Sequence, residues 1–229
     1  MFKLILAAVQ QDLFDAFKKH FSPFPEVEVV FKPFEQVDFD CVVSAANSFG
    51  LMDGGVDQCI TDYFGKQMME RVQHEIITRY YGEQPVGTSF IVRGNNSTID
   101  PKTGNLKRAR YVCHTPTMRI PMDIHLTRNV YMAMKSMLIA VKEHNMFADE
   151  DATLSPDLRI NTVVCPGLGI NTGRVPVDNA AKQMATAYYH FKNPPKKIDW
   201  YFASKRHNEI VRAEYTQGED EIDMSQFKN

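Results

Sequence analysis

The chain has 229 residues, of which 44% are hydrophobic, and this length and composition predict one domain with a substantial core. A formal net charge of −2 and the lack of a long basic run argue against nonspecific nucleic-acid binding through the phosphate backbone. No stretch reaches the roughly 18 apolar residues of a membrane span, and the run Leu4–Val9 is too short for a signal-peptide core, so we expect a cytoplasmic protein that does not enter a membrane.

The first part of the chain alternates between strand and helix patterns. Phe2–Val9 is typical of a strand, and Gln11–His20 of a short helix that ends before Ser22-Pro23. Glu26–Phe31 alternates polar and apolar residues, which predicts a half-exposed strand. Asp40–Ser44 is short, apolar and β-branched, as expected of a strand that is buried on both faces.

A glycine turn follows this strand and leads into a helix that the three-four spacing predicts over Val56–Tyr80. Gly54 and Gly55 permit positive φ and allow a ligand to approach the backbone without a Cβ clash. The unpaired N–H groups and positive dipole at the start of a helix suit an anion, most commonly a phosphate. An ordinary turn without a ligand is the alternative interpretation.

The rest of the chain continues the alternation of strands and helices. The patterns predict strands at Thr88–Arg93, Tyr111–His114, Ile160–Cys165 and Ile198–Ala203, helices at Ile124–His144, Val177–Phe191 and Asn208–Tyr215, and surface loops at Gly94–Gly104 and Phe147–Asp157. This alternation favours an α/β fold, with a three-layer α/β/α sandwich as the natural architecture. We expect one domain over residues 1–217 and a charged, flexible tail over residues 218–229.

A second glycine-rich junction, Pro166–Pro176, follows the predicted strand that ends at Cys165. Ligands of open α/β sheets lie at the carboxyl ends of the strands, so two such loops can hold one ligand between them. A diphosphate in this place would meet backbone N–H groups from both sides.

The cysteines and histidines show no metal-ligand spacing, and we expect neither a metal nor another cofactor. Cys41, Cys59, Cys113 and Cys165 are interpreted as reduced, buried thiols. His114 ends a strand and is either a packed core residue, which we favour, or a base. Nothing in the spacing supports Cys165 as a nucleophile that His114 activates.

Several separated motifs resemble those of the macro domain family. Ser44-Ala45-Ala46-Asn47 resembles the family's Asn-Ala-Ala-Asn, and Gly54-Gly55-Val56-Asp57 resembles its glycine run followed by an apolar residue and an aspartate. Tyr111–Thr115 is similar to the family's strand with a hydrophobic-His-Thr end, and the loop before Pro176 is similar to its second phosphate loop. The resemblance covers roughly Val29 to Phe202.

The resemblance implies a macro domain fold with a central mixed sheet, and binding of ADP-ribose or ADP-ribosylated protein. Some members hydrolyse ADP-ribose from side chains, and others remove the phosphate of ADP-ribose 1″-phosphate. Asn47 would contact the distal ribose, and Asp57 would position or activate a water, so these two residues are the expected catalytic pair. The expected ligand contacts come from both loops: Ala46, Asn47, Asp53, Gly54, Gly55 and Val56, and then Gly167, Leu168, Gly169, Ile170, Asn171, Thr172, Gly173 and Arg174.

The sequence departs from the family pattern in two places. Lys32-Pro33-Phe34-Glu35 stands where the family often has Gly-Asp-Ile-Thr, which leaves Glu35 or Asp40 to read the adenine. Met52 and Asp53 replace two of the usual glycines, and we expect them to narrow the space beside the ribose. Three functions stay open: an ADP-ribosyl hydrolase, a non-catalytic ADP-ribose reader, and an interaction module with a decayed site. Asp53 is a second candidate for the role of Asp57, and Arg174 either reaches a phosphate or points into solvent.

Overall fold

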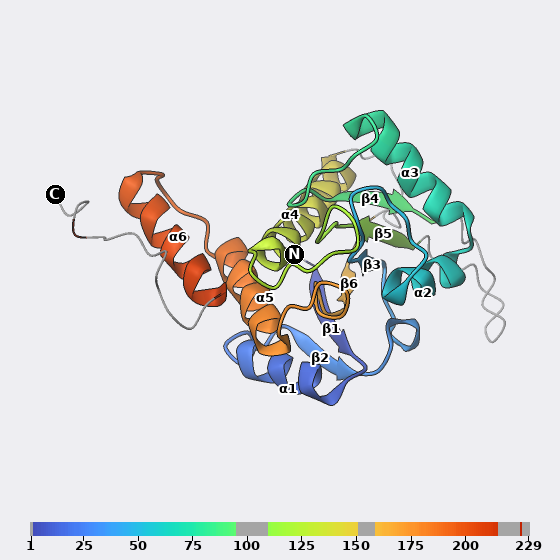
Figure 1. The fold of residues 1–229 in the computed structure, drawn as a ribbon. Coiled ribbons are helices and arrows are strands. Elements are labelled where there is room, and N and C mark those ends of the chain that lie inside the picture. Colours follow the sequence, from blue (N-terminus) through green and yellow to red (C-terminus); the bar gives the residue numbers. More distant parts are fainter. Residues whose placement is uncertain (1, 95–109, 151–158, 215–224, 226–229) are drawn as a thin grey trace.

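A six-stranded sheet with the order β2-β1-β6-β3-β5-β4 forms the middle layer of the computed structural model, which describes residues 2–94, 110–150, 159–214 and 225 (Figure 1). All neighbouring strands are parallel except β4, which runs antiparallel to β5, so the sheet is mixed. The strands are β1 Lys3–Ala8, β2 Glu28–Phe31, β3 Cys41–Ser44, β4 Phe90–Arg93, β5 Tyr111–His114 and β6 Thr162–Cys165.

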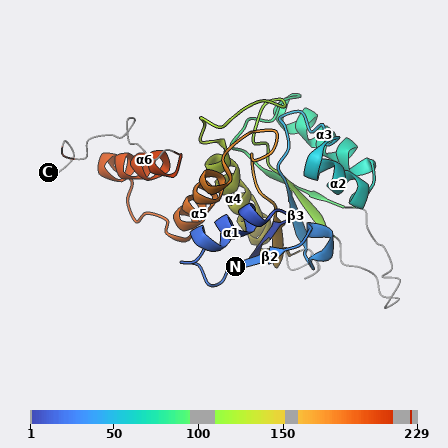
Figure 2. The ribbon, with the colours of Figure 1, turned by 60° about the horizontal axis from the view of Figure 1, so that its bottom comes forward.

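Helices cover both faces of this sheet. Those of the described residues are α1 Gln11–His20, α2 Gly55–Phe64, α3 Gln67–Tyr80, α4 Asn129–Glu150, α5 Val177–Lys192 and α6 Trp200–Glu214. Figures 1 and 2 show α1, α4 and α5 on one side of the sheet and α2 and α3 on the other. The predicted three-layer α/β/α sandwich is therefore confirmed.

Each face of the sheet has its own apolar core. Val43 packs with the residues of α1, α4 and α5, whereas its neighbour Val42 packs with those of α2 and α3. Successive side chains of a strand point to opposite faces, so a strand that is apolar throughout fits only between two layers. This explains why the β-branched run Cys41–Ser44 is buried at every position.

The register brings the two glycine junctions to the same edge of the sheet. β6 lies between β1 and β3, with Leu6 opposite Cys165 and Val42 opposite Val164. Because these strands are parallel, the chain leaves β3 and β6 side by side at their carboxyl ends. Ligands of such sheets bind at this edge.

Asp40 fastens the opposite, amino-terminal edge. Its Oδ2 accepts hydrogen bonds from the backbone N–H groups of Asn161 at 2.8 Å and Thr162 at 2.9 Å. Its own N–H donates to the carbonyl of Thr162, and its carbonyl accepts from the N–H of Tyr111. Asp40 thus joins β3 to both neighbours, and its suggested role in reading adenine is wrong because the carboxylate is used at the other edge.

The single helix expected over Val56–Tyr80 is wrong, because two helices occupy this stretch. Gly65 has φ +88° and ends α2, with its N–H donating to the carbonyl of Thr61. A glycine tolerates this left-handed conformation without a Cβ penalty, which makes it a common helix stop. The chain then turns and begins α3 at Gln67.

The strand expected at Ile198–Ala203 is also wrong, because α6 begins at Trp200. Asp199 caps this helix, since its Oδ1 accepts the N–H of Phe202 at 2.9 Å and its carbonyl accepts the N–H of Ala203. The aromatic run has strand propensity, but the local cap and packing of Val211 against the body decide the conformation. The short helix expected at Asn208–Tyr215 is the second half of α6 as far as the structure describes it.

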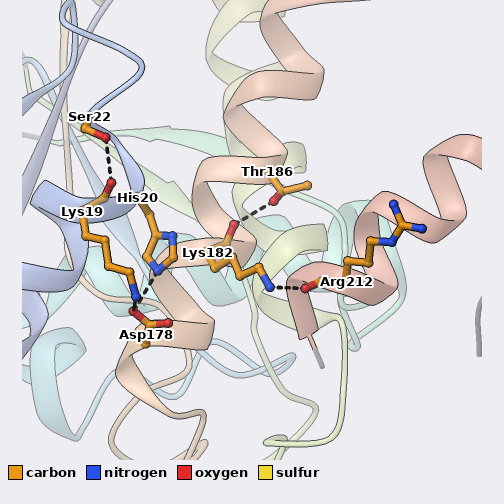
Figure 3. A network of polar contacts seen from close by, with 7 residues as sticks. All are labelled: Lys19, His20, Ser22, Asp178, Lys182, Thr186 and Arg212. Carbon is orange, nitrogen blue, oxygen red and sulfur yellow. Dashed lines mark hydrogen bonds and ion pairs between the residues drawn. The ribbon is translucent and has the colours of Figure 1, made fainter. Parts of the chain in front are cut away.

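Polar contacts join α1, α5 and α6 on the outside of the sandwich (Figure 3). Asp178, in the first turn of α5, accepts from Lys19 at 2.7 Å and lies 2.8 Å from Nε2 of His20. Further along α5, Lys182 donates to the carbonyl of Arg212 in the last turn of α6. A cation suits the carbonyl end of a helix, so these contacts fix the two outer helices to α5.

Some expectations fall partly or wholly outside the described residues. The loop expected at Gly94–Gly104 lies outside them from residue 95 on, and the tail at residues 218–229 lies outside them except for Ser225. The loop expected at Phe147–Asp157 is wrong in its first part, since α4 continues to Glu150, and its remainder lies outside the described residues. None of the described helices has the length and apolarity needed to cross a membrane.

Asp40→Ala is expected to lower the free energy of unfolding by about 2 kcal/mol, because it leaves two backbone N–H groups without their acceptor. Urea denaturation would measure this loss. Asp38→Ala is the matched control, since its exposed carboxylate makes only a 3.4 Å contact with Arg110 and should cost less than about 1 kcal/mol. An equal decrease in the free energy of unfolding in the two variants would contradict the role of Asp40 in joining the strands.

Candidate functional site

The two glycine loops face one cleft of about 430 Å³ at the carboxyl edge of the sheet. Gly55 and Val56 line it from the first loop. Pro166, Gly167, Ile170 and Asn171 line it from the second loop. The arrangement that sequence reasoning inferred, a cleft between two loops that follow neighbouring strands, is therefore present.

The other end of the cleft lies between the segments that follow β1 and β2. Val9, Gln10 and Leu13 line it on one side, and Lys32–Glu35 on the other. Glu35 belongs to a short 3₁₀ helix, Phe34–Gln36, and its side chain is exposed. This end of the cleft therefore offers apolar surface together with one carboxylate and one ammonium group.

Cys59 also lines the cleft and is exposed, so the expectation that all four thiols are buried is wrong for this residue. Cys59 lies in α2 on the side that faces the cleft, whereas Cys41, Cys113 and Cys165 belong to strands with both faces covered. Burial raises the pKa of Cys113 to about 12. Burial likewise raises the pKa of Cys165, which disfavours its thiolate and argues against Cys165 as a nucleophile.

The side chain of Asn47 holds the first loop together. Its Oδ1 accepts the N–H groups of Phe49 at 3.1 Å and Leu51 at 3.3 Å, and its Nδ2 donates to the carbonyl of Leu51 at 2.8 Å. An amide nitrogen has two N–H groups, and the second has no partner among the described residues. Asn47 thus shapes the loop and keeps one donor for another group.

Gly50 allows this loop to lie close to α3, a requirement that the sequence reasoning missed. It has φ +64°, and a Cβ at this position would lie 2.9 Å from side-chain atoms of both Val72 and Ile76. Any other residue would be strained and would also push the loop away from the helix. The sequence does contain an indication of this close approach, namely the glycine three positions after Asn47.

Met52 does not narrow the cleft, contrary to expectation. It is fully buried in the core between the sheet and α2 and α3, and its carbonyl accepts the hydroxyl of Thr61 at 2.8 Å. An apolar side chain gains more by entering this core than by lying in an open cleft. Asp53 and Gly54, which follow, are exposed.

Asp57 is a buried carboxylate in the first turn of α2. The hydroxyl of Ser44, at the end of β3, donates to its Oδ1 at 2.7 Å, and only 8% of the residue is exposed. Burial raises the pKa of Asp57 to about 6, and the hydrogen bond from Ser44 opposes this rise in part. The carboxylate is therefore a stronger base than an exposed aspartate, with a pKa close to neutrality.

The second loop is tightly folded on itself. Gly169 has φ +70°, and its carbonyl accepts the N–H of Val175 at 3.1 Å. A Cβ on Gly173 would lie 2.4 Å from the carbonyl oxygen of Gly169, so only glycine fits there. Leu168 is fully buried and anchors the loop in the core.

The remaining predicted residues lie at different depths around these loops. Asn171, Thr172 and Arg174 are exposed, whereas Ala46 is buried where the chain leaves β3. The Arg174 guanidinium points into solvent, with its Nη1 3.9 Å from Oδ2 of Asp123. The cleft lining includes five of the predicted ligand contacts, namely Gly55, Val56, Gly167, Ile170 and Asn171.

Residues 115–128 border both loops, and we call them the crossing segment. The helix expected from Ile124 begins only at Asn129, so Ile124–Arg128 belong to this segment. The N–H of Ser48 donates to the carbonyls of Met118 and Arg119, both at 3.1 Å. At the other end, the N–H of Ile124 donates to the carbonyl of Gly173 at 2.9 Å. The two loops are therefore connected through one stretch of backbone.

His114 is a core residue. It is fully buried, its Nδ1 donates to Oε1 of Gln84 at 2.6 Å, and its ring lies 5.3 Å from that of Phe90. Burial lowers the pKa of His114 to about 3, so the ring is neutral near pH 7. This favours the packed role over the base. Among the described residues, no group of three or more His, Cys, Asp and Glu side chains is placed to hold a metal ion.

Comparison with known proteins adds a family match. The model of the family described as "Macro domain" matches residues 43–184. An uncharacterized protein of Aquifex aeolicus is 28% identical over 188 residues, which are 82% of this chain and 94% of that protein.

Solved macrodomain structures are also similar. A mutant Oceanobacillus iheyensis macrodomain solved with ADPR shares the fold at a TM-score of 0.50, with 18% identity over 73% of this chain and 77% of that one. The macrodomain of Mycobacterium tuberculosis DarG gives a TM-score of 0.49 at 17% identity, over 68% and 84% of the two chains.

Asp57→Asn is expected to stabilise the protein at neutral pH. The folded-state pKa of about 6 lies above the ordinary 3.8, so the folded state binds the proton more tightly, and the free energy of unfolding falls as pH rises between these values. Above this window the ionised carboxylate costs on the order of 3 kcal/mol, which the neutral amide avoids.

Calorimetry near pH 7.5 should therefore show a melting temperature several degrees higher for Asp57→Asn, whereas the two proteins should melt alike near pH 4. Asp53→Asn, an exposed residue of the same loop, is the control and should change neither value. A stabilisation of equal size at both pH values would show that burial of charge is not its cause.

Proposed function

The chain belongs to the macro domain family, and on that premise we propose that it binds ADP-ribose between its two glycine loops and hydrolyses ADP-ribosyl groups from modified proteins. The observation that carries the proposal is the cleft itself, in which Gly55 and Val56 face Gly167 and Ile170 across a space of about 430 Å³. Such a cleft is deep enough to bury much of a nucleotide-sized ligand.

The diphosphate fits the start of α2. The first turn of this helix contains Gly55, Val56 and Asp57, whose N–H groups precede the first intrahelical bond, which Gln58 donates to Gly54. Free N–H groups at a helix start bind phosphate through hydrogen bonds and through the positive end of the dipole. The backbone thus supplies the donors, in a chain whose net charge is −2.

The adenosine half fits the other end of the cleft. Val9, Leu13 and the edge of Phe34 provide apolar surface for a base and a ribose. The exposed carboxylate of Glu35 lines the same end and suits the exocyclic amino group of adenine, to which an aspartate is bound in the family pattern. Of the two candidates for reading the adenine, Glu35 therefore fits this role and Asp40 does not.

In this proposal, the distal ribose lies beside the first loop. The free N–H of Asn47 donates to a ribose hydroxyl, while its other bonds keep the loop in shape. Asp57 accepts a proton from a water molecule as the water oxygen attacks the anomeric carbon, and the target side chain leaves with the electrons of the broken bond. A base whose pKa is about 6 is mostly ionised near pH 7 and still takes up a proton readily.

A non-catalytic reader is the second candidate, and the bond between Ser44 and Asp57 favours it. This bond joins the end of β3 to the start of α2, which is a structural role that needs no reaction. In a reader the same cleft would bind ADP-ribose, and the modification would stay on its protein.

The free state of the four cysteines supports a proposal for the cellular compartment in which the protein works. All four cysteines are free, and Cys59 is exposed in the cleft. Unpaired thiols of this kind are typical of reducing compartments, so we propose a cytoplasmic location.

ADP-ribose is expected to raise the melting temperature, because a ligand that binds only the native state stabilises it by mass action. Gly167→Val should weaken ADP-ribose binding by about tenfold or more. The new Cβ would lie 2.3 Å from Ile170 and 2.8 Å from Leu13, and it would displace both of these side chains, which line the cleft. Titration calorimetry measures the affinity, and circular dichroism shows that the variant is folded. Wild-type protein that gives neither heat nor a melting shift would refute the proposed ligand.

Release of ADP-ribose from a protein modified on acidic side chains is expected to rise with pH through about 6 and then level off, as Asp57 ionises. Ser44→Ala should move this rise to higher pH, because the hydroxyl bond that lowers the pKa of Asp57 is lost. Asp57→Ala should slow release by at least about tenfold. Chromatography of the released ADP-ribose across a pH series measures the release rates of the wild-type protein, Ser44→Ala and Asp57→Ala.

Asp53→Asn is the control for this series and should keep the wild-type rate and pH profile. If Asp53→Asn released ADP-ribose slowly while Asp57→Ala released it at the wild-type rate, Asp53 and not Asp57 would be the general base. Binding without any release by the wild-type protein would select the reader.

A further inference from the structure

The crossing segment presents apolar side chains to solvent beside the proposed reaction centre. Ile120 is 52% exposed, Met122 48% and Leu126 61%, and Leu51 of the adjoining first loop is 47% exposed. Exposed apolar residues that stand alone are ordinary on a protein surface. Four of them on two adjoining segments at the edge of a site are typical of an interaction surface.

These side chains are held outward by an ordered backbone. Met118 and Ile124 of the same segment are buried, at 7% and 2% exposure, and anchor it in the core. Thr127 donates from both its N–H and its hydroxyl to the carbonyl of Ile124, and the side chain of Asn129, the first residue of α4, donates to the carbonyl of Thr117. Ile120 and Met122 lie between these two buried anchors, and Leu126 follows the second, so the backbone that presents them is fixed at both ends.

The arginines of this surface already have partners. Arg119 makes a bidentate pair with Glu83, at 2.6 Å and 3.0 Å. Asp123 accepts from His125 and lies 3.9 Å from Arg174. A nucleic-acid partner requires cations that are free to meet its phosphates, whereas an apolar surface whose arginines are already paired fits a polypeptide.

The surface is also continuous with the site. The loop of Asn47 lies against the crossing segment through the bonds of Ser48, and the second loop does so through Gly173. A group attached to a distal ribose bound at Asn47 would therefore lie near this segment, because Asn47 pairs with Met118 in an isolated bridge.

We propose that the exposed apolar side chains of the crossing segment, together with Leu51, bind an apolar stretch of the polypeptide that carries the ADP-ribosyl group. This inference rests on the proposed function. It makes the enzyme selective for modified sites that have apolar residues beside them, because these residues lose contact with water when they pack on this surface.

The test uses two peptides ADP-ribosylated on one glutamate, one with leucines beside it and one with serines in their place. The double variant Ile120→Ser, Met122→Ser should raise the KM for the leucine peptide by about tenfold, with kcat and the affinity for ADP-ribose unchanged. The KM for the serine peptide should not change. Ile77→Ser on α3, where Ile77 is 64% exposed, is the matched control and should leave every value unchanged.

The outcomes separate this inference from the function on which it rests. Wild-type protein that releases nothing from either peptide refutes the proposed hydrolase. Release with the same KM for wild type and the double variant refutes the docking surface alone. A lower KM for an ADP-ribosylated oligonucleotide, raised by the same two substitutions, overturns the choice of a polypeptide carrier.

Discussion

The whole site depends on β3 and β6 lying side by side and parallel, because each strand delivers one glycine loop to the same edge of the sheet. Val42 and Val164 are partners in this pairing, and the carboxylate of Asp40 fastens the two strands at the far edge. Neighbouring strands are about 4.8 Å apart, and this spacing sets the distance between the points where the loops begin. The sheet thus fixes where the two walls of the cleft begin, and the conformations of the loops determine its shape.

Much of the fold could be predicted from the sequence because the strands carry their own signal. Runs such as Cys41–Ser44 are apolar at every position, which fits only a layer with helices on both sides. The incorrect predictions of helices and strands arose at single residues whose effect depends on the surrounding structure. Gly65 divides one periodic stretch into two helices, and Asp199 starts a helix in an aromatic run that has strand propensity.

The site was predictable in outline and not in its contacts. The spacing located Asn47 and Asp57 on either side of a glycine turn, yet it gave no indication of what their side chains bind. The hydrogen bond from Ser44 to Asp57 joins two elements, and the burial that raises the pKa of Asp57 comes from the packed structure around both. Met52 was misjudged for the same reason, since only the packed core shows that it turns inward.

The crossing segment gives the cleft a property that neither loop has by itself. Bonds from Ser48 to Met118 and from Ile124 to Gly173 hold both loops to one stretch of backbone before any ligand arrives. Ordering a mobile loop on binding consumes conformational entropy and weakens affinity. A cleft whose walls are already connected avoids this loss, so the contacts made by a ligand contribute more fully to its affinity.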